Sequence, residues 1–217
     1  MFKQYRKIEE GEYFVIAGDP AVGLGDNCAC QFISKTNVDV PLVYHSSAIA
    51  TQMTNDIIPV IEKLHDITGI KPILAYERNN GGVFEMERIA SMNRQGKFEI
   101  FKMPTLGQSN TPEAVKYGWD TNTATRPSML SELKEAIDSK VLRIYDEQTI
   151  NEMFSFIRVK TTATVKAQAE AGAHDDLIMS LAIAWQLYHQ CDTPKSDEFY
   201  ERYQPTETQK KQFRIGI

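Results

Sequence analysis

The fold is constrained most by the order of the first elements. Three strand-like segments joined by short turns come first, and a helix-like segment and another strand follow. The three segments span residues 13–19, 28–34 and 38–45 and are rich in apolar and β-branched residues. Connections this short fit an antiparallel meander. Pro41 lies near the start of the third segment and predicts an edge position for it, because proline cannot donate a hydrogen bond to a neighbouring strand.

The segments after the meander alternate between helical and extended patterns. Apolar residues recur every three or four positions over residues 48–69, so a strand at 72–77 must run parallel to a meander strand if that helix is a crossover. Further elements are expected at helix 83–92, strand 98–103, polar loop 104–126, a helix from Pro127, strand 141–145, mixed segment 149–157, hairpin 158–168 and helix 175–189. This order predicts an α/β protein.

Length and composition indicate one globular domain. The 217 residues, of which 42% are hydrophobic and 24% charged, suffice for a single core. We expect residues 1–12 to be a polar leading segment, 13–190 the domain, and 191–217 a C-terminal tail that is flexible or docks a partner. No apolar run approaches the roughly 18 residues of a membrane span and the start lacks a secretory signal, so a cytosolic protein is expected. The three cysteines show neither a disulfide framework nor zinc-ligand spacing.

Two acidic residues end predicted strands. Asp19 closes residues 13–19 and Glu77 closes residues 72–77. At a strand end, a carboxylate can reach into a cleft. Taken singly, Asp19 also fits a plain turn and Glu77 a solvated strand end.

Asp175 and Asp176 stand side by side at the start of the last apolar helix. One aspartate suffices to cap a helix, and adjacent like charges are costly unless a cation lies beside them. The pair therefore needs another reason, and together with Asp19 and Glu77 it predicts a metal site. We expect Asp175 to bridge to Asp19, with Asp176 either a ligand of a second ion or part of the cap.

The ligand types indicate a hard cation. Carboxylates without a His or Cys cluster favour Mg²⁺ or Mn²⁺ over zinc. Two such ions about 3.5 to 4 Å apart can activate a water and stabilise the leaving 3′ oxygen in phosphodiester hydrolysis. His174 is a candidate to orient a water or phosphate, with a structural role as the alternative, and Asp26 either supports the second metal or starts a turn, which we favour.

Basic residues of the predicted hairpin are the candidate nucleic-acid contacts. The formal net charge of −5 argues against a general polyanion-binding surface but does not exclude a local basic strip. Arg158, Lys160 and Lys166 have one acidic residue nearby, Glu170, and are predicted to follow a phosphate backbone. An ordinary solvated face is the alternative.

Four motifs follow one another along the chain. They are V-I-A-G-D-P-A at 15–21, Y-E-R-N-N-G-G at 76–82, G-W-D-T at 118–121 followed by Thr125-Arg126, and G-A-H-D-D-L-I-M-S at 172–180. Each is weak singly, but their order and spacing are specific. In these motifs the chain resembles the nuclease domain of the large terminase subunit of tailed bacteriophages, over roughly residues 13 to 190.

The resemblance implies a ribonuclease H-like mixed sheet, in which a three-strand antiparallel meander is extended by parallel strands and flanked by helices. It implies a Mg²⁺- or Mn²⁺-dependent endodeoxyribonuclease with two metal ions, which cuts concatemeric viral DNA during genome packaging in the host cytoplasm. By motif position, Asp19, Glu77 and Asp175 are implied as catalytic metal ligands and Asp176 as an additional ligand. The hairpin looks like the family's substrate-guarding hairpin. Implied partners are double-stranded DNA, a packaging ATPase domain, the portal and the small terminase subunit, with no membrane.

The chain departs from the family in one respect. Full-length large terminases also carry a P-loop ATPase, and no GxxxxGK[ST] motif is present here, so we expect the nuclease part alone. A Holliday junction resolvase or ribonuclease H of the same fold is the alternative enzyme. A non-catalytic docking module of a packaging motor, using residues 104–126 and the tail, is the alternative outside catalysis.

Overall fold

A central mixed sheet organises the chain. The computed structural model describes residues 1–21, 27–79, 81–103, 116–160, 165–169 and 174–193, with backbone alone over 156–160 and 165–169. Within these residues the sheet has seven strands: β1 (Phe2–Gln4), β2 (Phe14–Asp19), β3 (Cys28–Ser34), β4 (Asp39–Ser46), β5 (Ile73–Tyr76), β6 (Glu99–Ile100) and β9 (Arg143–Ile144). Their order is β1-β4-β3-β2-β5-β6, and β9 also pairs with β4.

The pairing directions confirm the predicted sheet. β2, β3 and β4 form the antiparallel meander, and β5 lies parallel to β2. Helix α1 (Ala50–Thr68) is the crossover from β4 to β5, and it ends at Gly69 in the left-handed conformation. β6 extends the parallel part beyond β5.

The predicted edge position of the third meander strand is wrong. β1 pairs with the second half of β4, from Leu42 to Tyr44, while β9 pairs with Asp39 and Val40. Pro41 falls between the two partners, where the register with β3 also shifts. The missing N–H of Pro41 is tolerated because the ladder is interrupted there on both sides. Residues 1–12 are thus more than a polar leading segment, since they supply a strand.

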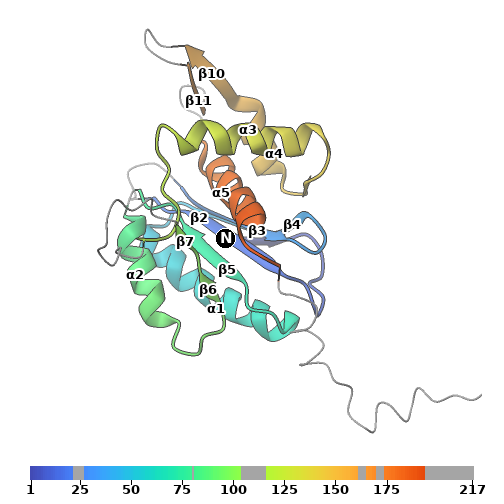
Figure 1. The fold of residues 1–217 in the computed structure, drawn as a ribbon, viewed down its shortest axis with the longest axis vertical. Coiled ribbons are helices and arrows are strands. Elements are labelled where there is room, and N and C mark those ends of the chain that lie inside the picture. Colours follow the sequence, from blue (N-terminus) through green and yellow to red (C-terminus); the bar gives the residue numbers. More distant parts are fainter. Residues whose placement is uncertain (22–26, 80, 104–115, 161–164, 170–173, 194–217) are drawn as a thin grey trace, which may run out of the picture.

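Helices cover both faces of the sheet. α1 and α2 (Gly82–Met92) lie on one face, and α5 (Asp176–Gln190) crosses the other, with α3 (Thr125–Asp138) beyond it (Figure 1). Alternate residues of β2 divide between two hydrophobic clusters: Val15 and Ala17 pack with α5, whereas Phe14 and Ile16 pack with α1 and α2. This alternation places Asp19, two residues after Ala17, on the face covered by α5.

The structure revises several predicted elements. The strand expected at 98–103 divides into β6 and β7 (Lys102–Met103), and β7 pairs with β8 (Lys116–Tyr117) inside the segment predicted to be a loop. α3 begins at Thr125, two residues early, and the mixed segment is helix α4 (Glu147–Ser155). The hairpin is confirmed as β10 (Phe156–Lys160) and β11 (Val165–Ala169). In the described residues, no helix combines the length and apolarity that a bilayer crossing requires.

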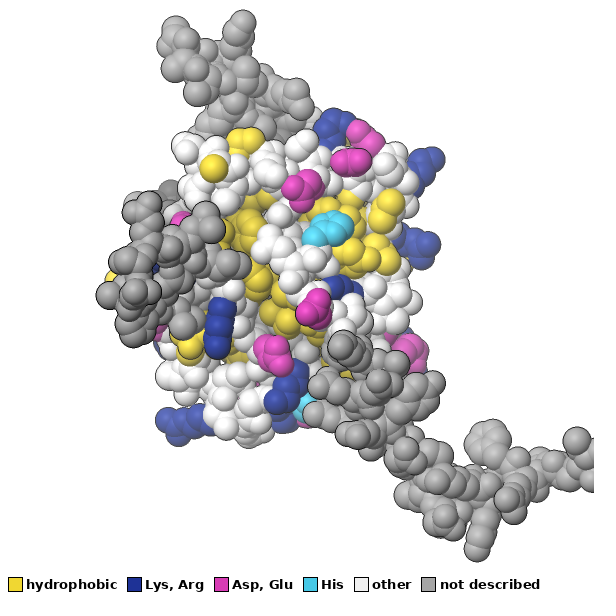
Figure 2. Space-filling view, viewed as in Figure 1, with side chains coloured by type: hydrophobic (Ala, Val, Ile, Leu, Met, Phe, Trp, Pro, Cys, Tyr) yellow, Lys and Arg dark blue, Asp and Glu magenta, His cyan; other side chains and the backbone are white. Residues whose placement is uncertain are grey.

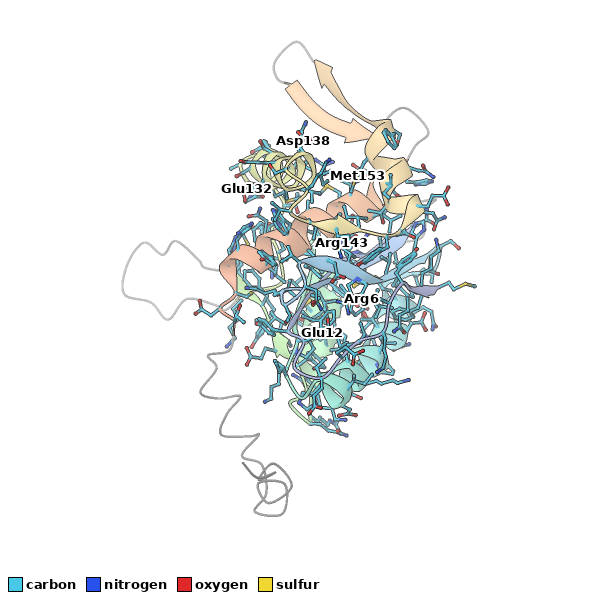
Figure 3. The ribbon with its side chains drawn as sticks, turned by 90° about the vertical axis from the view of Figure 1, so that its right-hand side faces the viewer. Arg6, Glu12, Glu132, Asp138, Arg143 and Met153 are labelled. Atoms are coloured by element: carbon cyan, nitrogen blue, oxygen red, sulfur yellow. The ribbon has the colours of Figure 1, made fainter. Side chains whose placement is uncertain are left out.

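The N-terminal residues anchor α4 to the sheet. Arg6 lies close to Glu12 (Figure 3). It pairs with the buried carboxylates of Glu12 and Asp39, with N–O distances of 2.7 and 2.6 Å. Tyr5 donates a hydrogen bond to Asp146, whose other oxygen accepts one from the backbone N–H of Thr149 at 2.8 Å. The start of α4 is therefore held in place, which matters because α4 reaches the acidic residues described next.

Candidate metal centre

Asp19 and Glu77 lie at the ends of two adjacent parallel strands. Gly18 is paired with Tyr76 in the β2–β5 register, so the two acids follow the last ladder pair on the same face. The backbone N–H of Glu77 donates to the carbonyl of Gly18 at 2.8 Å. Both side chains are buried, with Asp19 8% and Glu77 6% exposed. Since neighbouring strands are about 4.8 Å apart, the sheet itself brings these carboxylates together.

The chemistry of Asp19 reflects this crowding. Burial raises the pKa of Asp19 well above its ordinary value, and the charge of Glu77, a hydrogen bond with Glu77, and the charges of Asp176 and Asp175 raise it further. Each of these effects disfavours the charged form. The four acids predicted from the sequence therefore lie within electrostatic reach of one another.

Two motifs hold Glu77 in position. Asn79 Nδ2 donates to Glu77 Oε1 at 2.9 Å and to the carbonyl of Thr121 at 3.1 Å. Trp119 forms an isolated parallel bridge with Glu77. Gly82 approaches the backbone of Glu77 so closely that a Cβ at residue 82 would overlap the Glu77 carbonyl oxygen. The Y-E-R-N-N-G-G and G-W-D-T motifs thus form one structural unit around this carboxylate.

The start of α5 is capped from another helix. Asp175 occupies the N-cap position, but its side chain makes no capping hydrogen bond. Glu152 of α4 takes that place: its Oε2 accepts the backbone N–H of Leu177 at 2.9 Å and of Ile178 at 3.2 Å. Glu152 was not predicted from the sequence, because no local pattern marks a cap supplied by a distant segment. Capping does not account for Asp175.

Asp175 and Asp176 have different partners. Arg126 Nη2 donates to Asp175 Oδ2 at 2.7 Å, and both side chains are partly exposed. Asp176 is buried, and its Oδ2 accepts the backbone N–H of Asn27 at 3.2 Å. His174 Nδ1 lies 3.7 Å from the same Asp176 oxygen, with nearly half of the His174 side chain exposed. Asp175 is therefore directed towards α3, and Asp176 towards the sheet.

The donor set fits a hard divalent cation. Every acidic side chain at the site offers carboxylate oxygen, and a cation among them would offset the burial and the repulsion that together raise the pKa of Asp19. The pKa of Glu152 is also raised, to about 8, by burial foremost and by the charges of Asp176 and Asp175, against two backbone hydrogen bonds that lower it. In the described part of the chain, no three His, Cys, Asp or Glu side chains are already grouped closely enough to hold a metal. Asp175 is directed towards α3 by its ion pair with Arg126.

Two buried polar atoms beside the acids need a further partner. Among the described residues, Thr121 Oγ1 and Arg126 Nε are buried and have no hydrogen-bond partner. Thr121 accepts at its carbonyl from Asn79, the residue that holds Glu77. Buried polar atoms are normally satisfied by protein or water. Five other buried side-chain atoms of the described residues also lack a partner, so these two do not by themselves mark a ligand site.

The remaining predicted residues are less defined. Asp26 lies outside the described residues. In the hairpin, Arg158 is paired with Ala167, Lys160 with Val165, and Lys166 with Val159, and the structure describes their backbone alone. On the view in Figure 2, the described Lys and Arg side chains are scattered among acidic ones. The role of the hairpin in DNA binding stays a prediction.

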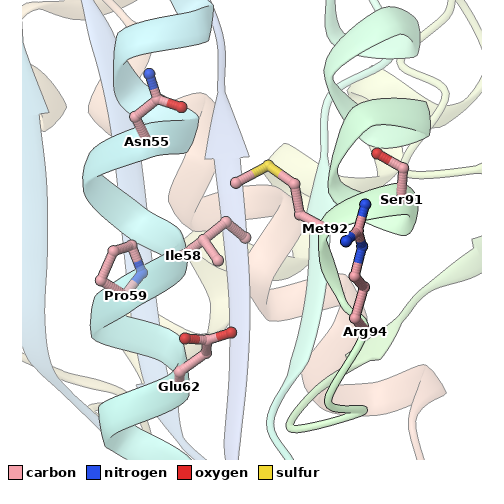
Figure 4. A pocket seen from close by; sticks show the side chains of 7 residues that line it. All are labelled: Asn55, Ile58, Pro59, Glu62, Ser91, Met92 and Arg94. Atoms are coloured by element: carbon pink, nitrogen blue, oxygen red, sulfur yellow. The ribbon is translucent and has the colours of Figure 1, made fainter.

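A groove between α1 and α2 is separate from these acids. It is lined by α1 from Asn55 to Glu62 and by Ser91, Met92 and Arg94 at the end of α2 (Figure 4). These helices lie on the face of the sheet opposite α5. The groove is therefore not part of the metal centre.

Comparisons with known proteins identify the fold. No protein family model and no curated protein matches the sequence. Among solved structures, the large terminase nuclease domain of Thermus phage P74-26 aligns with a TM-score of 0.58 and 17% identity, over 89% of this chain and 87% of that chain. The magnesium-bound large terminase nuclease of thermophilic phage G20c aligns with a TM-score of 0.56 and 14% identity, over 87% and 85%. The manganese-soaked terminase nuclease domain of human cytomegalovirus aligns with a TM-score of 0.52 and 17% identity, over 87% of this chain and 91% of that chain. The chain therefore has the ribonuclease H-like fold of terminase nuclease domains, as the resemblance implied.

Proposed function

We propose that this chain is a Mg²⁺- or Mn²⁺-dependent endodeoxyribonuclease that cuts concatemeric viral DNA during genome packaging. The observation that carries the proposal is the burial of Asp19 against Glu77 beside Asp175 and Asp176, which raises the pKa of Asp19. Buried acids repel one another, and a cation bound among them would offset that repulsion. The likeness to terminase nucleases solved with magnesium, cobalt, zinc or manganese supports a divalent cation.

The proposed ligands are Asp19, Glu77, Asp175 and Asp176. Asp19 and Glu77 are held by the ends of β2 and β5, which position them rigidly. From α5 we propose Asp176 as the principal ligand, in place of the Asp175 expected from the sequence, because Asp176 is the more buried of the two and contacts Asn27 next to β3. Asp175 is the additional ligand, and Arg126 compensates its charge.

The bound ions would supply an activated water and stabilisation of the leaving 3′ oxygen. The chain's own residues orient that chemistry. Asn79 fixes Glu77, Glu152 fixes the start of α5, and Arg126 stands beside Asp175. No protein side chain is required as the general base.

The biological setting of the proposal comes from the sequence resemblance to large terminases. It includes double-stranded DNA as substrate, a packaging ATPase domain, the portal and the small terminase subunit as partners, and the host cytoplasm as location. Arg158, Lys160 and Lys166 of the hairpin are proposed to contact the phosphate backbone.

Plasmid nicking tests the proposal. Supercoiled DNA incubated with the protein and Mg²⁺ or Mn²⁺ should be nicked, and both EDTA and Asp19→Asn should abolish the reaction. Asp138→Asn is the matched control, because Asp138 is exposed at the end of α3 and pairs with Lys134. Nicking by Asp19→Asn at the control rate would refute the site. Preference for a four-way junction or an RNA·DNA hybrid over plain duplex would instead favour a resolvase or a ribonuclease H.

A further inference from the structure

Glu152 makes two contacts that connect α4 to the acidic end of α5. Its Oε2 accepts the N–H groups of Leu177 and Ile178 at 2.9 and 3.2 Å. These donors belong to the first turn of α5, where N–H groups have no partner inside the helix. An N-cap side chain normally accepts them, and the N-cap residue of α5 is Asp175.

We propose that Glu152 is a positioning residue of the metal centre, which caps α5 from α4 and thereby fixes the start of the helix and keeps the carboxylate of Asp175 out of the cap. The inference rests on the proposed function. Aspartate is among the best capping residues, so without Glu152 the carboxylate of Asp175 would turn back onto the N–H groups of its own helix. Capping and metal binding compete for one side chain, and Glu152 removes the competition.

The electrostatics of Glu152 support this role. Burial, together with the charges of Asp176 and Asp175, raises its pKa to about 8. A third carboxylate beside two others is a costly way to cap a helix whose N-cap residue is already an aspartate. The arrangement is explained if the carboxylates of the pair are reserved for another ligand.

A second contact fixes α4 against the same turn of α5. Gln31 of β3 donates from Nε2 to Thr149 Oγ1 at 3.0 Å and to the carbonyl of Leu177 at 3.3 Å. Thr149 is also bound by Asp146 at the start of α4. Glu152 is thus presented by a helix that is anchored to the sheet, as a positioning residue requires.

The test compares Glu152→Ala with Glu152→Gln in the full chain. The amide oxygen of glutamine can accept both N–H groups but carries no charge. Glu147→Ala removes an exposed acid from the same helix, and Ala182→Gly loosens α5 away from the cap. Two quantities are measured without DNA: the Mn²⁺ dissociation constant by calorimetry, and amide hydrogen exchange at Leu177 and Ile178.

Glu152→Ala should weaken Mn²⁺ binding about tenfold or more, as loss of residues that orient metal ligands commonly does. It should also speed exchange at both amides, while Glu152→Gln, Glu147→Ala and Ala182→Gly keep Mn²⁺ affinity close to that of the wild type. Wild-type affinity in Glu152→Ala overturns the inference. So does a Glu152→Gln variant as weak as Glu152→Ala, because Glu152 would then act through its charge. If the wild type itself binds no Mn²⁺, the proposed metal function fails. If amide exchange at Leu177 and Ile178 is unchanged in Glu152→Ala, the capping role of Glu152 fails.

Discussion

A methyl group added at residue 82 should displace Glu77 and disable the metal centre. The Cβ of Gly82→Ala would overlap the carbonyl oxygen of Glu77 and lie 2.9 Å from its carbonyl carbon and 3.2 Å from Cγ of Pro20. Real Cβ atoms essentially never show contacts under 3.0 Å, and the obstructing Glu77 atoms are backbone, which cannot rotate away. The Glu77 peptide must therefore move, together with the carboxylate beside Asp19.

The expected size of the effect follows from that displacement. A shift of about 1 Å at a reacting centre lowers the rate by about 10²-fold. Overpacking a tight contact also costs about 1 to 3 kcal/mol of stability, which leaves many variants folded. Gly82→Ala should therefore fold with a lowered Tm, bind Mn²⁺ more weakly and nick plasmid about 100-fold more slowly than the wild type.

Gly96→Ala separates the displacement of Glu77 from general strain. Gly96 has a φ of +60°, so alanine strains its backbone, but the nearest atom to the added Cβ is the flexible Lys71 Nζ at 3.8 Å. Gly82 is the first residue of α2, whereas Gly96 comes after the last residue of that helix. We expect Gly96→Ala to lose stability and keep its nicking rate. If Gly82→Ala nicks DNA as fast as Gly96→Ala under saturating Mn²⁺, the close approach does not position Glu77.

Two further predictions concern charge. Burial alone would raise the pKa of Glu12, but hydrogen bonds from Arg6 and neighbouring groups outweigh burial and lower that pKa. The ionised Glu12 therefore stabilises the folded state fully above about pH 4.3, the pKa of an unfolded glutamate, and this stabilisation is lost as the pH falls through the folded-state pKa. Thermal melts should show a steeper acid loss for the wild type than for Glu12→Gln, and parallel curves would contradict this. Arg126→Gln removes a partly exposed ion pair with Asp175, of up to about 1 kcal/mol, and should lower Tm more in EDTA than in Mn²⁺, where the cation compensates the charge. An equal loss in both buffers would count against metal binding by Asp175.

The sequence predicts the part of the site that depends on the sheet. Period-two alternation places Asp19 on the face of Val15 and Ala17, and a helical crossover requires the strand ending at Glu77 to be parallel. Those two local rules already bring the acids to one edge, and the structure confirms the parallel pairing of β2 with β5. The apolar pattern after Asp176 likewise predicts a buried helix, and α5 is buried along most of its length.

Contacts between distant segments were not predictable in the same way. Pro41 predicted an edge position, but β1 and β9, which are far apart in the sequence, both pair with β4, one on each side of Pro41. β1 and β9 contain only three and two residues, too few for a periodic pattern to mark. Glu152 was missed because its partners are N–H groups 25 and 26 residues away. Such contacts depend on tertiary packing, which a local pattern does not encode.

The two adjacent aspartates are separated by the geometry of the helix on which they stand. Successive residues of an α-helix point about 100° apart, so neighbours at a helix start face different elements. Asp175 faces α3 and the guanidinium of Arg126, whereas Asp176 faces the sheet and the N–H of Asn27. Because Asp19 and Glu77 emerge from that sheet, the buried Asp176 extends their acidic row, while the charge of Asp175 is balanced by a cation of the protein itself. A single dipeptide thereby joins the strands to α3, and this explains why both positions carry a carboxylate when capping would require one.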